Sequence, residues 1–253
     1  MVDSAALPLA SVRNVLLRAF DDERPGVRIN GLAAAATFAD SSYAPRAATL
    51  LGDPDPNVRV AAAAALGEMK SQVAATALVG AFDKKGATWA LRRTALAALA
   101  RADTAAFASR AAPWLASADV RERLNALAVW GSIKGADPAI FRAALADPDA
   151  GVQAAALTAW QAAATRGDSA VATAARGLLT SPRSEVRAAA AGALRTTATL
   201  DDLDPLLAAW RLSASEGDPD TRLAVFRTLS DLARRSPELV ARLEEATRRG
   251  FLS

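Results

Sequence analysis

The sequence lacks two residue types that often carry chemistry, cysteine and histidine. Without cysteine, the chain can form neither a disulfide nor a thiolate metal site. Without histidine, it lacks the commonest general base and the commonest ligand of zinc, copper and iron. Any metal would need oxygen ligands alone, so we expect no metal site, no cofactor and no catalytic residue.

Long hydrophobic runs are also missing from the sequence. No stretch reaches the roughly 18 uncharged apolar residues that a membrane-spanning helix requires. The start of the chain has neither the basic region nor the apolar centre of a secretory signal. We therefore expect no membrane partner and a cytoplasmic location if the chain is complete, whereas the location stays open for a piece of a longer precursor.

The chain has little excess charge of either sign, with a formal net charge of +3. Its isoelectric point of about 9.8 overstates this excess. Because histidine and cysteine are absent, few groups titrate between about pH 5 and pH 9, and a few arginines raise the value. The isoelectric point therefore does not indicate nucleic-acid binding.

Motifs for enzyme chemistry are missing as well. Neither G-x-G-x-x-G nor G-x-x-x-x-G-K-[ST], the glycine-rich loops that cradle phosphates, occurs in the sequence. Adjacent residues on a helix do not face each other, so neighbouring acids make poor acid–base pairs. This applies to Asp21-Asp22, Asp201-Asp202 and Glu244-Glu245. We expect that the chain is not an enzyme.

The chain does contain an internal repeat. Segments that begin near residues 53, 149 and 184 each read as a turn, then Val-Arg or Val-Gln, then small residues and a large apolar residue. Self-similarity at such a period is typical of repeat architectures. One residue in each copy serves as its anchor, and successive anchors lie 29 to 35 residues apart. The anchors are Val27, Val58, Leu91, Val120, Val152, Val186 and Thr221.

Counted from each anchor, apolar residues follow the period of a helix. Offsets four and seven are small in most copies, as at Ala62 and Ala65, and offset eight is usually large, as at Leu66. Offsets zero, four, seven and eight trace one face of a helix. Small residues there let a neighbouring helix approach closely. The fourth copy has Leu124 and Leu127 at the small offsets, so we expect altered packing or a bend there.

Capping residues mark the starts of the anchored helices. Aspartate and serine favour the N-cap, and proline favours the first helical position. Two of the expected caps directly precede a proline. The predicted N-caps are Asp55, Ser117, Asp149, Ser184 and Asp218.

Shorter amphipathic stretches lie between the anchored helices, and each pairs with the anchored helix that follows it. These stretches cover residues 11–20, 43–51, 72–82, 104–116, 138–146, 169–179 and 203–212, and a last helix covers 237–249. No pattern typical of strands competes with them. The predicted fold is all-α, an α-α superhelix of about seven two-helix repeats plus a terminal helix, in a single domain over residues 1–253.

The pattern D-P-x-x-V-R-x-x-A-x-x-A-L resembles bacterial HEAT-like repeats, including the type found in phycobilisome (PBS) lyase subunits. The resemblance covers nearly the whole chain and implies a right-handed solenoid. It also implies a ladder of hydrogen bonds between adjacent repeats, although the same row of side chains could instead bind a ligand. The ladder residues would be Arg28, Arg59, Arg92, Arg121, Gln153, Arg187 and Arg222.

The concave side of such an array is the candidate binding surface. Offset two of the anchored helices lies on it, and alanine there could merely favour the helix. Ile29, Val60 and Leu223 are not explained by helix propensity, so we expect a groove that receives a partner. Trp130 is a candidate interface anchor. The candidate partner-binding residues are Ile29, Val60, Arg93, Glu122, Trp130, Ala154 and Leu223.

The leading interpretation is a non-enzymatic scaffold that binds another protein on its concave helical surface. One alternative is binding of a nucleic-acid backbone, which scattered arginines such as Arg93, Arg195 and Arg227 do not favour. The other is a subunit or appendage of an enzyme, such as a bilin lyase-like complex. HEAT hydroxylases that hold iron through His-Glu pairs are excluded by the lack of histidine. The apolar residues near the C-terminus suggest a fragment of a longer chain.

Overall fold

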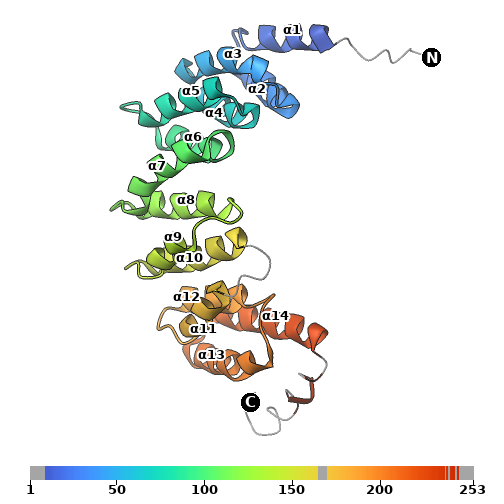
Figure 1. Cartoon of the computed structure of the whole chain (residues 1–253), viewed down its shortest axis with the longest axis vertical. Coiled ribbons are helices and arrows are strands. Elements are labelled where there is room, and N and C mark those ends of the chain that lie inside the picture. The colour runs from blue at the N-terminus through green and yellow to red at the C-terminus, as the bar shows by residue number, and fades with distance from the viewer. Residues whose placement is uncertain (1–8, 165–169, 237, 239, 243, 245–253) are drawn as a thin grey trace, which may run out of the picture. The chain divides into compact units, whose positions relative to one another are not determined.

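A computed structural model describes residues 9–164, 170–236, 238, 240–242 and 244. Within these residues all regular structure is helical and there is no strand, so the all-α prediction is confirmed (Figure 1). The predicted terminal helix over residues 237–249 lies mostly outside the described residues. The helices fall into two compact units, Met1–Trp114 and Leu115–Ser253. The prediction of one domain over residues 1–253 and a right-handed superhelix stays a prediction.

The first unit contains three helix pairs followed by one more helix. Short 3₁₀ segments, Ser41–Tyr43 and Leu50–Gly52, flank the third helix. The helices are α1 (Leu9–Ala19), α2 (Pro25–Phe38), α3 (Ala44–Thr49), α4 (Pro56–Met69), α5 (Gln72–Asp83), α6 (Trp89–Ala102) and α7 (Thr104–Leu115).

The second unit continues the alternation of anchored and shorter helices. A 3₁₀ segment, Leu200–Asp202, leads into one of the shorter helices. The helices are α8 (Val120–Gly131), α9 (Pro138–Ala144), α10 (Ala150–Ala163), α11 (Ala170–Leu178), α12 (Ser184–Ala193), α13 (Leu203–Glu216) and α14 (Pro219–Arg235).

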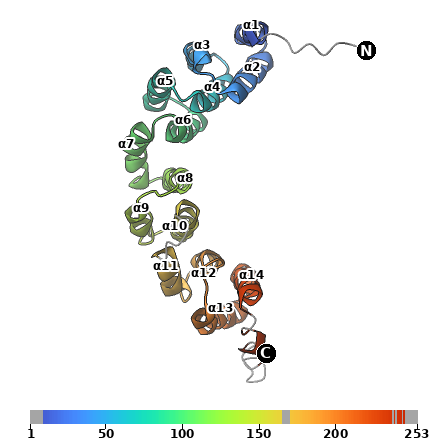
Figure 2. The same cartoon turned by 45° about the vertical axis from the view of Figure 1, so that its right-hand side comes forward.

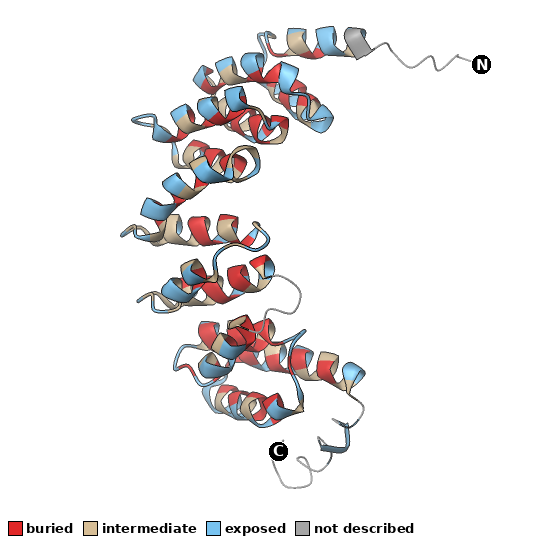
Figure 3. Cartoon of the chain, in the orientation of Figure 1, coloured by how far each residue is buried: buried red, intermediate tan, exposed pale blue. Residues whose placement is uncertain are grey.

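Each unit has two layers of helices. The even-numbered helices pack directly against one another, α2–α4–α6 in the first unit and α8–α10–α12–α14 in the second. The odd-numbered helices form the other layer (Figure 2). The buried residues lie on the faces where the helices meet (Figure 3). Each hairpin therefore buries its apolar stripe against neighbouring hairpins, which is the packing of an α-solenoid.

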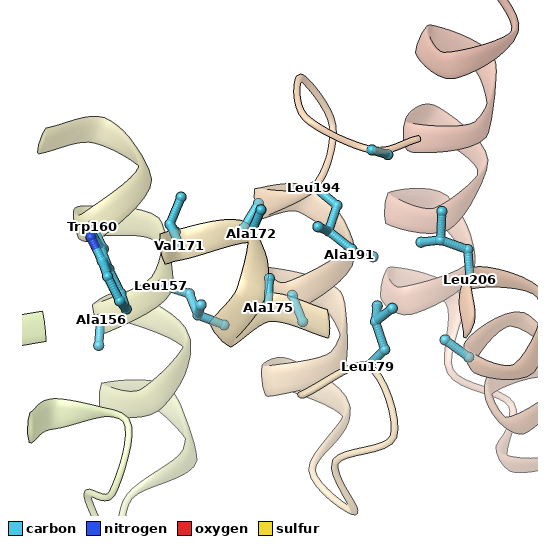
Figure 4. Close-up of a cluster of buried hydrophobic side chains, with 14 of the residues drawn as sticks. Ala156, Leu157, Trp160, Val171, Ala172, Ala175, Leu179, Ala191, Leu194 and Leu206 are labelled. Carbon is cyan, nitrogen blue, oxygen red and sulfur yellow. The ribbon is translucent and has the colours of Figure 1, made fainter. Parts of the chain in front are cut away.

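The core of the second unit shows how large and small residues alternate. Trp160, on α10, is almost fully buried, as predicted for offset eight. Leu157 and Val171 pack in the same cluster, and Leu179 and Leu206 extend it toward α13 (Figure 4). Alanines from α10, α11 and α12 fill the remaining space and allow the helices to approach closely.

The sequence places the anchor of the fourth repeat two residues too early. Asp119, rather than Ser117, caps α8, so the repeat is anchored at Glu122 and not at Val120. Counted from Glu122, the small offsets hold Ala126 and Val129, both buried, as in the other copies. Neither a swapped packing nor a bend is needed to explain the sequence of this repeat.

The cap of α12 also differs from the prediction. Its N-cap residue is Arg183, whose side chain makes no capping hydrogen bond, and Ser184 is the first residue of the helix. The predicted caps Asp55, Asp149 and Asp218 do accept hydrogen bonds from the backbone N–H groups of the first helical turn. These bonds satisfy donors that have no partner inside the helix.

Two glycines allow the even-numbered helices to approach closely. A Cβ atom on Gly67 would lie 2.8 Å from Cβ of Ala98, and one on Gly131 would lie 2.9 Å from Cα of Ala159. Both glycines occupy offset nine and face the next even-numbered helix. At these places the spacing between repeats depends on the absence of a side chain.

Candidate interaction surface and arginine ladder

The side chain of Arg28 links two adjacent repeats, because it contacts the turns before both of their anchored helices. Its Nη1 donates to the backbone oxygens of Asp22 and Glu23, at 2.7 and 3.0 Å. Its Nε and Nη2 bind the two carboxylate oxygens of Asp53, each at 2.9 Å. Asp53 lies five residues before the next anchor, and both side chains are almost fully buried. The planar guanidinium thus joins the turn before its own helix to the turn before the next.

The same arrangement recurs at the fourth repeat, through Arg123. This side chain donates to the backbone oxygen of Ser117 at 2.8 Å and to the carboxylate of Asp147 at 2.8 and 3.0 Å. Arg121, predicted as the ladder residue, instead contacts Asp119 in its own turn at 2.7 Å. That prediction is wrong, because the ladder residue lies four residues after the true N-cap.

Arg187 forms the most buried contact of this kind. It donates to the backbone oxygen of Ser181 at 2.8 Å, and its guanidinium pairs with Glu216 and, at 3.1 Å, with Asp218. Burial acts to raise the pKa of Asp218, but hydrogen bonds from Thr221 and Arg187 outweigh it. The pKa of this carboxyl therefore lies below its usual value.

Two ladder residues keep the contact to their own turn only. Arg59 Nη1 donates to the backbone oxygen of Asp53 at 2.7 Å, and Gln153 Nε2 donates to that of Asp147 at 2.6 Å. The positions where the carboxylate would stand hold Gly86 and Ser181. At the fifth repeat, both the cation and its acceptor are therefore replaced by neutral residues.

Arg92 and Arg222 lie over aromatic rings. The Arg92 guanidinium carbon is 5.0 Å from the ring centre of Phe82 and 5.1 Å from that of Trp114. The Arg222 carbon is 4.9 Å from the ring of Trp210. Such stacking stabilises a cation through the ring quadrupole.

The predicted partner-binding row lies along the even-numbered helices of both units. Ile29, Val60 and Ala154 are half-buried, whereas Arg93 and Leu223 are exposed. Ile29, Val60 and Arg93 belong to separate helices of the first unit, and Ala154 and Leu223 belong to separate helices of the second.

Two members of the predicted row are misplaced by the shift in the fourth repeat. Glu122 occupies the anchor position, so offset two of this repeat holds Leu124, which packs partly against the core. Trp130 moves from offset ten to offset eight, the large core position. It is half-buried and packs against the core of the second unit, which identifies it as a core residue.

The second unit has a groove on its even-numbered layer. It has a volume of about 470 Å³ and is lined by residues of α10, α12 and α14 and of the segment that follows α12. Its small lining residues are Ala189, Gly192, Ala193 and Ala224, and its polar ones are Thr158, Gln161, Arg195, Thr196, Arg227 and Asp231. Arg195 forms an ion pair with Asp231.

None of these lining residues stands in the predicted row. The lining residues stand at offsets three, six, seven, nine and ten, which is one to eight residues further along the helices than offset two. One feature of the sequence could have indicated the groove. Offset six is alanine in the first four repeats in their true register, and then changes to Thr158, Gly192 and Arg227.

The described residues offer few other sites. Among them, no group of three or more histidine, cysteine or acidic side chains could hold a metal ion. No helix in this part of the chain is long and apolar enough to cross a membrane. A second hollow of about 380 Å³, in the first unit, lies over the loop between α5 and α6 and is lined by Lys84, Lys85, Gly86 and Arg92 among others.

Stacked αα-hairpins joined by buried arginine–carboxylate contacts define a class of protein, the α-solenoids. Residues 13–100 match the family model for HEAT repeats, so the resemblance to HEAT repeats is confirmed for that segment. A solved structure of human deoxyhypusine hydroxylase in complex with glycerol has 16% sequence identity and a TM-score of 0.37, over 89% of this chain and 88% of that chain. Similarity at this level supports no statement about function. A comparison with curated proteins gives no match.

Proposed function

We propose that this chain is a non-enzymatic scaffold that binds another protein through the surface of its even-numbered helices. HEAT repeats commonly serve as scaffolds for protein interaction. The observation that carries the proposal is the groove over α10, α12 and α14. A hollow lined by both small and polar residues suits a segment of another protein.

An exposed apolar side chain supports the same layer. Leu223, at offset two of α14, is 47% exposed. Large apolar residues that remain accessible on a folded protein favour association.

Affinity capture with matched variants tests this proposal. The full chain serves as bait in a lysate of its source organism, and mass spectrometry identifies the proteins retained. Thr158→Glu places a charge in the groove, and Ala154→Glu places one a turn earlier on the same helix, α10. Gly177→Glu places the same charge on α11 of the other layer. We expect loss of specific prey with the first two variants and retention with the third.

The variants must remain folded, which circular dichroism checks. Gly177 suits the control because a side chain there meets open space. An unchanged prey profile for both even-layer variants would contradict the proposal.

A further inference from the structure

We propose that the groove over α10, α12 and α14 recognises an acidic segment of a partner protein, with Arg227 as the residue that selects the carboxylate. This inference rests on the proposed function and specifies the partner's chemistry. It is drawn from three features of the groove, which are its floor, its charge and its size.

The floor of the groove, at Gly192 on α12, lacks a side chain, although the packing of the helices does not require glycine there. Gly192 lies in the last turn of α12, and a Cβ atom built there would meet no atom within 4 Å. Glycine within a helix destabilises it by about 0.5–1 kcal/mol relative to alanine. Gly67 and Gly131 are explained by close helix packing, but Gly192 is not.

Gly80 and Gly177 also have open space above them, yet neither lines this groove. At Gly192 the missing side chain leaves the helix backbone accessible from the groove. A peptide can therefore approach the α12 backbone closely.

The charge of the groove is positive and partly uncompensated. Arg195 is paired with Asp231, which also binds Arg234 at 3.0 Å. Arg227 is exposed, and among the residues that the structure describes nothing forms a hydrogen bond or an ion pair with it. An exposed guanidinium beside an apolar floor can form a bidentate, charge-assisted pair with a carboxylate.

Two other polar side chains of the groove are already engaged. Gln161 Nε2 donates to the backbone oxygen of Ala193 at 3.1 Å, and the Thr158 hydroxyl donates to that of Ala154 at 3.1 Å. Arg227 is therefore the group that remains for recognition of a charged ligand. A groove of about 470 Å³ accommodates several side chains of a peptide.

A nucleic acid fits this groove less well. Binding to a phosphate backbone requires several cations that are free to replace counterions. Here one of the two lining arginines is neutralised by Asp231, and the carboxylate itself lines the groove. An acidic peptide needs one such cation and an apolar floor, and both are present.

Fluorescence anisotropy with designed peptides tests the proposal. The probes are a labelled helical peptide of glutamate, leucine and alanine, its counterpart with glutamine for every glutamate, and a labelled DNA duplex. We expect the full chain to bind the acidic peptide about tenfold more tightly than the glutamine peptide, as for loss of one charge-assisted contact.

Four variants locate the binding. Arg227→Gln should abolish the preference for the acidic peptide, and Gly192→Leu should fill the floor and weaken binding of both peptides. Arg18→Gln, on α1, removes the same charge from an exposed arginine of the other layer, and Gly177→Leu adds the same side chain on α11. These two controls should bind as the unmodified chain does.

Several results would overturn the inference. They are equal affinity for the two peptides, no peptide binding at millimolar concentration, unchanged binding by Gly192→Leu, or tighter binding of the duplex than of the acidic peptide. If the peptides fail while Thr158→Glu and Ala154→Glu still release captured proteins, the scaffold function stands and only the acidic specificity is wrong.

Discussion

At the scale of single residues, buried ionic contacts link adjacent repeats at Arg28, Arg123 and Arg187. Arg187 is fully buried, and its guanidinium faces Glu216 and Asp218. A buried ion pair adds little net stability compared with apolar packing, but loss of one partner leaves an uncompensated charge in a low dielectric.

Replacing Arg187 therefore has a clear expected result. Arg187→Met should lower the free energy of unfolding by about 3–5 kcal/mol, because Asp218 would remain buried without its cation. Urea denaturation followed by circular dichroism measures this. Arg121→Met serves as the control, since Arg121 is exposed and pairs with Asp119 in its own turn. Equal stability of both variants would show that the Arg187 contact is not buried as described.

The pH dependence of stability should follow the buried carboxylates. Burial alone would raise the pKa of Asp202. Hydrogen bonds from Arg176 and Thr199 lower it by more than burial raises it, so the pKa in the folded protein lies below the usual value. A depressed folded pKa contributes stability above the unfolded value of about 3.9, and this stability is lost as the pH falls through the folded value.

Asp202→Asn isolates this effect. The difference in urea midpoint between the original chain and the variant should be largest at neutral pH and should shrink below about pH 4. A difference that stays constant down to about pH 2 would contradict the assignment.

At the scale of helices, glycine has opposite effects at two positions. Gly131→Ala would bring a Cβ atom to 2.9 Å from Cα of Ala159. Overpacking of this kind costs about 1–3 kcal/mol, more than alanine's helix propensity returns. Gly192→Ala meets open space and should stabilise α12 by up to about 1 kcal/mol. Thermal unfolding of both variants compares them, and a stabilising Gly131→Ala would contradict the close approach of α8 and α10.

Gln153 and Ser181 are the neutral residues that replace the cation and its carboxylate at the fifth repeat, and they offer a second test. Gln153→Arg and Ser181→Asp together recreate the residue types found at Arg28 and Asp53. The double variant should be more stable than the sum of the single changes predicts, with a coupling of roughly 0.5–3 kcal/mol. A double-mutant cycle measures this coupling, and additive effects would mean that Gln153 does not face position 181 as Arg28 faces Asp53.

At the scale of the whole molecule, much of the fold could be predicted because the repeat is strongly periodic. Six of the seven anchors stand where the sequence places them, since each must bury the same apolar stripe. The fourth fails because the sequence Val-Arg-Glu-Arg offers two arginines two residues apart. The N-cap decides between them. In every repeat the ladder residue lies four residues after the cap, as Arg123 does after Asp119 and Arg59 after Asp55.

The candidate site could not be predicted to the same extent. The groove depends on three helices that lie 30 or more residues apart in sequence and pack side by side only in the folded chain. Its distinguishing residues, Gly192 and Arg227, stand at offset six, where the first four repeats have alanine, and their residue types follow no pattern. Apolar periodicity locates a core, whereas a binding groove on the solvent side is marked only by departures from it.

The central claim, that a partner binds on the even-numbered layer of the second unit, is tested most directly by photo-crosslinking. A photoreactive phenylalanine analogue replaces Thr196 at the groove or, as control, Gly177 on α11. The full chain is then irradiated with the proteins that it captures. We expect a covalent adduct of partner size from position 196 and none from position 177. An adduct from position 177 with none from position 196 would contradict this claim.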